Sequence, residues 1–120
     1  MNLNTYQPIA NDFAKHEHPD YAFTGLFAEA GEVSDKLAKF GRKHGVSINT
    51  AIRAAANPHT DAEFKLREDL QKELGDVLWF VSRCASILCM DLGADIADGN
   101  IRKLKDRADR GVIIGEGDNR

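Results

Sequence analysis

Hydrophobic side chains recur at three- and four-residue intervals along almost the whole chain, and no stretch alternates strictly between apolar and polar residues. The first pattern is typical of helices, whereas strict alternation is typical of half-buried strands. Four amphipathic helices are predicted, at about Thr5–Lys15, Tyr21–Lys43, Thr60–Leu92 and Asp95–Arg110. The expected fold class is therefore all-α, a four-helix bundle.

The segments between these helices contain residues that end helices. Each predicted helix is followed by one of them: Pro19, Gly45, Gly93 and Gly111. Residues 44–60 are rich in Ala, Asn and Ser and contain Pro58, so we expect a loop insertion with at most one weak helical turn. Thr60 followed by Glu63 has the form of a capping box, which predicts a helix start there. The glycine-rich tail, residues 111–120, is not expected to be helical.

Length, charge and cysteine content limit the classes of protein. A chain of 120 residues is expected to be one domain, residues 1–120. Its 16 Lys and Arg against 19 Asp and Glu argue against a nucleic-acid polymer as partner. No apolar run approaches the roughly 20 residues that cross a bilayer, and the N-terminal residues do not resemble a secretory signal. Cys84 and Cys89, within an apolar run, favour a reducing compartment. We expect a small acidic cytoplasmic domain without a membrane partner.

The helix predicted to follow Thr60 contains a run, Val77–Val81, that leaves no polar side over more than a full turn. A helix that is apolar all round is buried all round. One layer of four helices does not easily provide such burial, so we expect this helix to pack against another copy of the chain. The alternative is that the 44–60 loop covers Trp79.

Acidic residues fall on the apolar stripes of the two long helices. At about 100° per residue, the apolar neighbours of Glu73 lie within about 60° of it: Leu66, Leu70, Val77, Phe80 and Cys84. Glu73 is therefore central in its stripe, and Asp76 lies at the edge. Glu29 borders the apolar stripe of the helix before, with Glu32 beside it. Two pairs of acids should thus face the bundle interior.

Buried carboxylates without partners cost several kcal/mol each, so a group of four requires cations. Oxygen-only ligands select Mg²⁺ or Mn²⁺. Di-iron bundles use Glu-x-x-His pairs, but the fourth positions here are Glu32 and Asp76, which disfavours iron. The alternative is that the acids form ordinary salt bridges with Lys36, Lys39 or Arg83.

A basic stripe follows on the last predicted helix, where Asn100, Lys103, Arg107 and Arg110 are spaced three, four and three. No acid interrupts this stripe in the predicted arrangement. Lys and Arg side chains beside a carboxylate–metal cluster are the arrangement expected to bind a polyphosphate. The alternative is that these basic residues keep the helix soluble and interact favourably with its C-terminal end. The same alternative explains the basic cluster that ends the second helix, of which only Lys36 is counted as a candidate substrate contact.

Three segments carry a resemblance to the MazG-like family of all-α nucleoside triphosphate pyrophosphohydrolases. They are Glu29-Ala30-Gly31-Glu32-Val33, Glu73-Leu74-Gly75-Asp76-Val77-Leu78-Trp79 and Asn100-Ile101-x-Lys103-Leu104-x-x-Arg107. The resemblance spans about Phe23 to Gly111. It implies Mg²⁺-dependent cleavage of (deoxy)nucleoside triphosphates to the monophosphate and pyrophosphate. It also implies that the chain assembles as a dimer or tetramer.

The resemblance also implies residue roles. The metal ligands would be Glu29, Glu32, Glu73 and Asp76. Asn100, Lys103 and Arg107 would contact phosphates or sugar. The 44–60 insertion has no counterpart in compact members. The tail resembles tails of some bacterial and phage relatives and is expected to close over the triphosphate.

The functional hypothesis is therefore Mg²⁺-dependent hydrolysis of (deoxy)nucleoside triphosphates, with Mn²⁺ able to substitute and a purine such as (d)GTP as the first candidate. The predicted catalytic residues are Glu32, as general base, and Glu73. Predicted substrate contacts are Lys36, Trp79, Asn100, Lys103, Arg107 and Arg110. For Trp79 the alternative is core filling. Alternative functions are a phosphoribosyl-ATP pyrophosphatase, a dCTP- or dUTP-specific diphosphatase, or a helical interaction module without catalysis.

Overall fold

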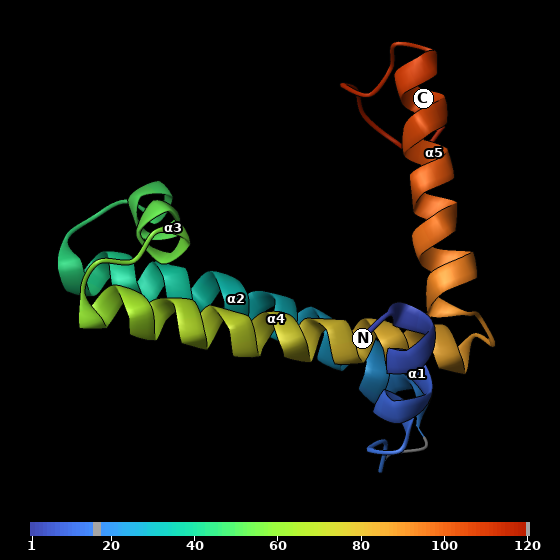
Figure 1. The fold of residues 1–120 in the computed structure, drawn as a ribbon, viewed down its shortest axis with the longest axis horizontal. Coiled ribbons are helices and arrows are strands. Elements are labelled where there is room, and N and C mark those ends of the chain that lie inside the picture. The colour runs from blue at the N-terminus through green and yellow to red at the C-terminus, as the bar shows by residue number, and fades with distance from the viewer. Residues whose placement is uncertain (16–17, 120) are drawn as a thin grey trace.

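A computed structural model describes residues 1–15 and 18–119, and this part of the chain contains helices and no strand. The helices are α1 (Leu3–Asn11), α2 (Pro19–His44), α3 (Ile48–Ala56), α4 (Asp61–Ile87), the π-helical segment η1 (Leu92–Ala97) and α5 (Asp98–Asp109). Figure 1 shows α2 and α4 side by side, with α1 near one end of the pair, α3 near the other, and α5 projecting away. The all-α prediction is confirmed.

The end of α2 and the start of α4 lie where their capping residues predict. Pro19 occupies the first turn of α2, and Gly45 ends it in the left-handed conformation at φ 65°. Thr60 and Glu63 form the predicted capping box at the start of α4. Because both helices are long and regular, the position of a residue in the sequence determines which face of its helix the side chain occupies.

The loop expected at residues 44–60 was wrong, because nine of these residues form α3. The side chain of Ser47 caps it by accepting a hydrogen bond from the backbone N–H of Thr50, at 3.1 Å. Ala51 and Ala55 are buried, and they form a core cluster with Leu66 of α4. Alanine is small enough for α3 to lie close to both long helices.

The helix predicted at Thr5–Lys15 is shorter and earlier, because Asn2 caps α1 by accepting from the backbone N–H of Thr5 at 2.9 Å. Of the break predicted at 16–20, residues 16 and 17 lie outside the described part of the chain. The buried amide of Gln7 holds α1 in place: it donates to Ser86 Oγ and to the Met90 carbonyl, and accepts from the backbone N–H of Leu92. Polar contacts of this kind leave no hydrophobic pattern.

The helix predicted to reach Leu92 ends at Ile87 instead. Cys89 takes a positive φ of 56°, the chain turns, and Asp91 caps η1. The predicted helix Asp95–Arg110 is thus divided between η1 and α5, and the segment Leu92–Asp109 lies at 102° to α4. Among the described helices α5 contacts only η1, so one chain alone does not close a four-helix bundle. Oligomerisation, which was expected to complete it, stays a prediction.

No single helix in the described residues is long and apolar enough to cross a membrane. The two segments Asp61–Ile87 and Leu92–Asp109, taken together as a bent pair, are long and apolar enough by length and composition only.

Candidate metal centre

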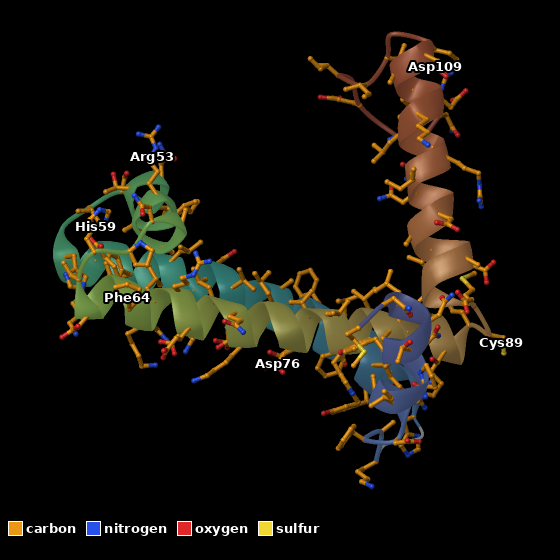
Figure 2. The ribbon with its side chains drawn as sticks, in the orientation of Figure 1. Arg53, His59, Phe64, Asp76, Cys89 and Asp109 are labelled. Atoms are coloured by element: carbon orange, nitrogen blue, oxygen red, sulfur yellow. The ribbon has the colours of Figure 1, made fainter. Side chains whose placement is uncertain are left out.

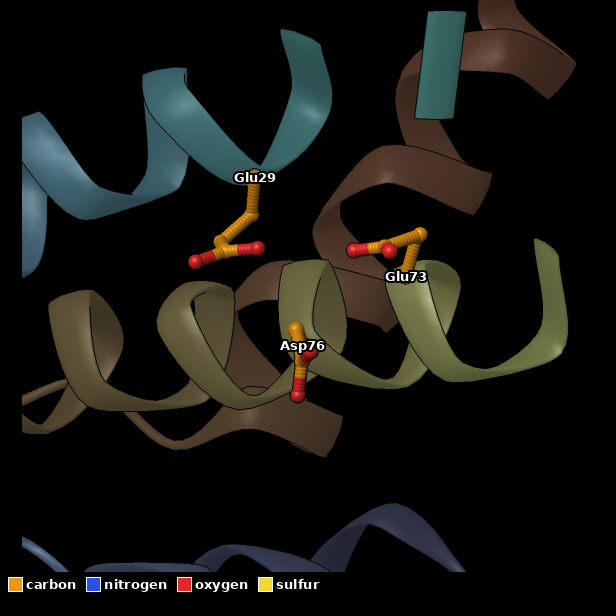
Figure 3. Close-up of side chains that lie close together, drawn as sticks. All are labelled: Glu29, Glu73 and Asp76. Carbon is orange, nitrogen blue, oxygen red and sulfur yellow. The ribbon is translucent and has the colours of Figure 1, made fainter. Parts of the chain in front are cut away.

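The pairing of α2 with α4 brings three of the four predicted acids together. One carboxylate oxygen each from Glu29, Glu73 and Asp76 lies within 4.8 Å of the other two. Figure 3 shows Glu29 and Glu73 directed toward one another between the helices, with Asp76 on the next turn of α4. Glu29 and Glu73 are half-buried, whereas Asp76 is exposed. We refer to these three residues as the acid cluster.

Within the acid cluster, the surroundings of Glu29 penalise its negative charge. Burial raises the pKa of Glu29 above its ordinary value, and the charges of Asp76, Glu73 and Glu32 raise it further. A cation would remove this penalty. The donor set fits a hard divalent ion, because all three ligands are carboxylate oxygens.

Ordinary salt bridges account for only one of the acids. Lys36 Nζ lies 3.5 Å from Glu73 Oε1, as the alternative reading of the sequence required. In contrast, Lys39 pairs with Asp35, and Arg83 donates to the side chain of Asn11. Among the described residues, none of the ion pairs involves the other three predicted ligands: Glu29, Glu32 and Asp76. Most of the acidic charge is therefore uncompensated within the chain.

Glu32 lies outside the acid cluster and is exposed on α2. Its charge still reaches the site, since it contributes to the raised pKa of Glu29 and of Lys39. Its predicted roles as metal ligand and as general base both stay predictions.

The basic residues of α5 do not reach the acid cluster within one chain, because α5 contacts neither α2 nor α4. Figure 2 shows this separation between Asp76, midway along α4, and Asp109 at the far end of α5. Asn100 is exposed on α5. The predicted substrate contacts of this helix would have to meet the acids through another chain.

The C-terminal tail folds back onto α5 and covers part of its basic stripe. Arg107 is only 5% exposed and donates to the carbonyl and side-chain oxygens of Asp118, at 3.3 and 3.2 Å. Lys103 Nζ lies 3.7 Å from the same carboxylate. The hydrogen bond from Arg107 and the charge of Lys103 lower the pKa of Asp118. Arg110 pairs with Asp106 at 2.7 Å, so the prediction that no acid meets this stripe was wrong.

Two further residues lie where α1 packs against α4: Trp79, which was predicted as a substrate contact, and Tyr6, which was not predicted. Trp79 faces α1, where its indole N–H donates to the Ala10 carbonyl at 3.0 Å. This contact corresponds to core filling, and α1 provides the cover that the alternative assigned to residues 44–60. Tyr6 of α1 was not predicted, yet Asp76 contributes to raising its phenol pKa, after burial. The sequence carries no signal for Tyr6, because only the packing of α1 brings it near the acids.

The structure is therefore that of an all-α protein in which an antiparallel pair of helices brings three carboxylates, two of them half-buried, into a candidate divalent-cation site. Residues 18–112 match the MazG nucleotide pyrophosphohydrolase domain, and the chain belongs to this family. The chain is also similar to the Gene 37 protein of Mycobacterium phage L5, with 37% identity over 130 aligned positions that cover the whole of both proteins. No solved structure matches the chain. Membership of this family supports nucleotide pyrophosphohydrolase activity in general for this chain.

Proposed function

We propose that the protein hydrolyses (deoxy)nucleoside triphosphates to the monophosphate and pyrophosphate with Mg²⁺, for which Mn²⁺ substitutes. The observation that carries this proposal is the convergence of Glu29, Glu73 and Asp76 from two helices. A nucleotide substrate follows from the family. The metal follows from the chemistry of the donors, which are three hard oxygens.

Each acid has a distinct role in the proposal. Glu29, Glu73 and Asp76 hold divalent cations, which supply charge neutralisation and the activation of water. Glu32 is exposed one turn from Glu29, where it is available to accept a proton from water as general base. Lys36, already 3.5 Å from Glu73, is available to a phosphate oxygen beside the acid cluster.

A panel of nucleotides tests the substrate. With Mg²⁺ we expect release of pyrophosphate and monophosphate in equal amounts from at least one (d)NTP, with (d)GTP first among the candidates, and no release in the presence of a chelator. Exclusive turnover of dCTP, dUTP or phosphoribosyl-ATP would favour the corresponding alternative enzyme. Failure to cleave any triphosphate with Mg²⁺ or Mn²⁺ would favour the interaction module.

We further propose that the protein is a homo-oligomer, a dimer or a tetramer. Support comes from large apolar side chains exposed at i, i+4 spacing on both central helices: Phe23 and Phe27 on α2, and Leu74 and Leu78 on α4. Phe27 is 86% exposed, which is costly in water for an isolated chain. A second copy would both cover this face and bring an α5 to the acids. The free thiols Cys84 and Cys89 support a cytoplasmic location, in a bacterium or in the host of a phage.

Sedimentation velocity tests the oligomer. The wild-type chain is expected to sediment as a dimer or tetramer, and Phe27→Lys to shift it toward the monomer, because a charge would be buried in the interface. Ile114→Lys is the matched control, since Ile114 is 96% exposed but lies in the tail. A monomeric wild-type chain, or equal dissociation by both variants, would contradict the proposed interface.

A further inference from the structure

A row of lysines continues the acidic faces of α2 and α4. On α2, Glu32, Lys36, Lys39 and Lys43 are spaced by four, three and four residues, which places them on one helix face. On α4, Lys65, Asp69 and Asp76 are spaced by four and seven residues, which also places them on one helix face. The acids occupy one end of this surface and most of the lysines occupy the other, toward α3.

The lysine end of this surface is hollowed. A cavity of about 290 Å³ lies between α2 and α4, and Lys36, Lys39, Lys43 and Lys65 line it. Phe40 and Leu66 provide apolar lining. The ring of His44 lies against that of Phe40, with centroids 4.2 Å apart, and also lines the cavity. This volume is at the lower end of the range for ligand pockets, so it suits a small anionic group and not a whole nucleotide.

The residues that line the cavity carry a net positive charge, although three of the four lysines also pair with acids: Lys36, Lys39 and Lys65. Four ammonium groups line it, against the single carboxylate of Asp69. Asp69 pairs with Lys65, and Lys39 pairs with Asp35 on its own helix. Lys36 connects the cavity to the acid cluster through its 3.5 Å contact with Glu73. Cation-binding and anion-binding groups are therefore adjacent in one chain, with Lys36 at the boundary.

We propose that this lysine groove binds the condensed-phosphate end of the nucleotide and free pyrophosphate. The inference rests on the proposed function and adds a subsite to it. A triphosphate is a polyanion, and lysines bind phosphate oxygens as point charges. The basic residues of α5 contact neither α2 nor α4, so the lysine groove supplies the cations that adjoin the acids in the same chain. The sequence pattern alone left Lys39 and Lys43 as favourable charges near a helix C-terminus.

Calorimetric titration with pyrophosphate in the presence of Mg²⁺ tests the lysine groove without requiring turnover. The wild-type protein is expected to bind pyrophosphate, and the double variant Lys43→Ala/Lys65→Ala to bind at least about tenfold more weakly. Lys105→Ala on α5 is the matched control and should retain wild-type affinity. Circular dichroism checks folding, and Lys43→Gln/Lys65→Gln replaces the double variant if the alanine version unfolds.

Hydrolysis measured in parallel separates the two proposals. An increased KM in the double variant, together with weaker pyrophosphate binding, supports the lysine groove. Unchanged pyrophosphate affinity in the double variant, or no pyrophosphate binding by an active wild-type enzyme, overturns the groove and leaves the proposed function standing. Lysine-dependent pyrophosphate binding without hydrolysis of any nucleotide overturns the proposed function and retains the groove as a pyrophosphate site.

Discussion

Glu73→Gln is expected to lower the kcat of nucleotide hydrolysis at least about 100-fold, because even residues that only support metal ligands cost 10- to 100-fold when removed. The amide is nearly the same size as the carboxylate but carries no charge to hold a cation. Glu73 contributes from the centre of the helix pair, where its side chain is 16% exposed. Initial rates of pyrophosphate release at saturating nucleotide and Mg²⁺ provide the measurement.

The stability of Glu73→Gln distinguishes a functional acid from a structural one. In the acid cluster the neutral amide removes repulsion with Glu29 and Asp76, so the Tm in chelator is expected to equal or exceed that of the wild type. If the pair with Lys36 were the main role of Glu73, the same substitution would lower Tm and leave catalysis to other residues. Glu68→Gln, an exposed acid on the same helix, is the matched control and should change neither quantity.

The position of the acid cluster could be predicted because it depends on local regularities. A constant angle per residue placed Glu73 in its apolar stripe and Glu29 at the border of another, and both are half-buried in the structure. The capping box at Thr60 fixed where α4 begins. Long regular helices carry such angles accurately over many turns, so two helices were enough to bring three carboxylates together.

Features that depend on contacts between distant segments could not be predicted. α3 packs through alanines, and α1 is held by the polar side chain of Gln7, so large hydrophobic side chains do not show where either helix docks. Gly93 indicated a helix end, but the turn occurs earlier, at Cys89. The resulting 102° bend carries α5 away from the acids. Spacing alone located the basic stripe on its helix but could not locate that helix in space.

Mg²⁺ is expected to raise the thermal stability of the protein. A ligand at 100 times its Kd adds about 2.7 kcal/mol to the free energy of unfolding, which corresponds to roughly 10 °C in Tm for a chain of this size. Differential scanning calorimetry at fixed protein concentration, with Mg²⁺ or with a chelator, measures the shift. Glu73→Gln should lose most of it, and potassium chloride at equal ionic strength should not reproduce it.

The size of this shift should depend on pH in a direction set by Glu29. Its pKa is raised in the folded chain from an ordinary value of 4.5, so the folded state binds this proton more tightly than the unfolded state. In chelator, its contribution to stability therefore falls as pH rises from 4.5 through the raised pKa. Mg²⁺ competes with that proton, so the Mg²⁺-induced rise in Tm should be larger near about pH 7.5 than near about pH 5. Glu29→Gln should flatten this dependence. A shift that grows on acidification would place the cation away from these carboxylates, because only ligands that lose protons bind it better at higher pH.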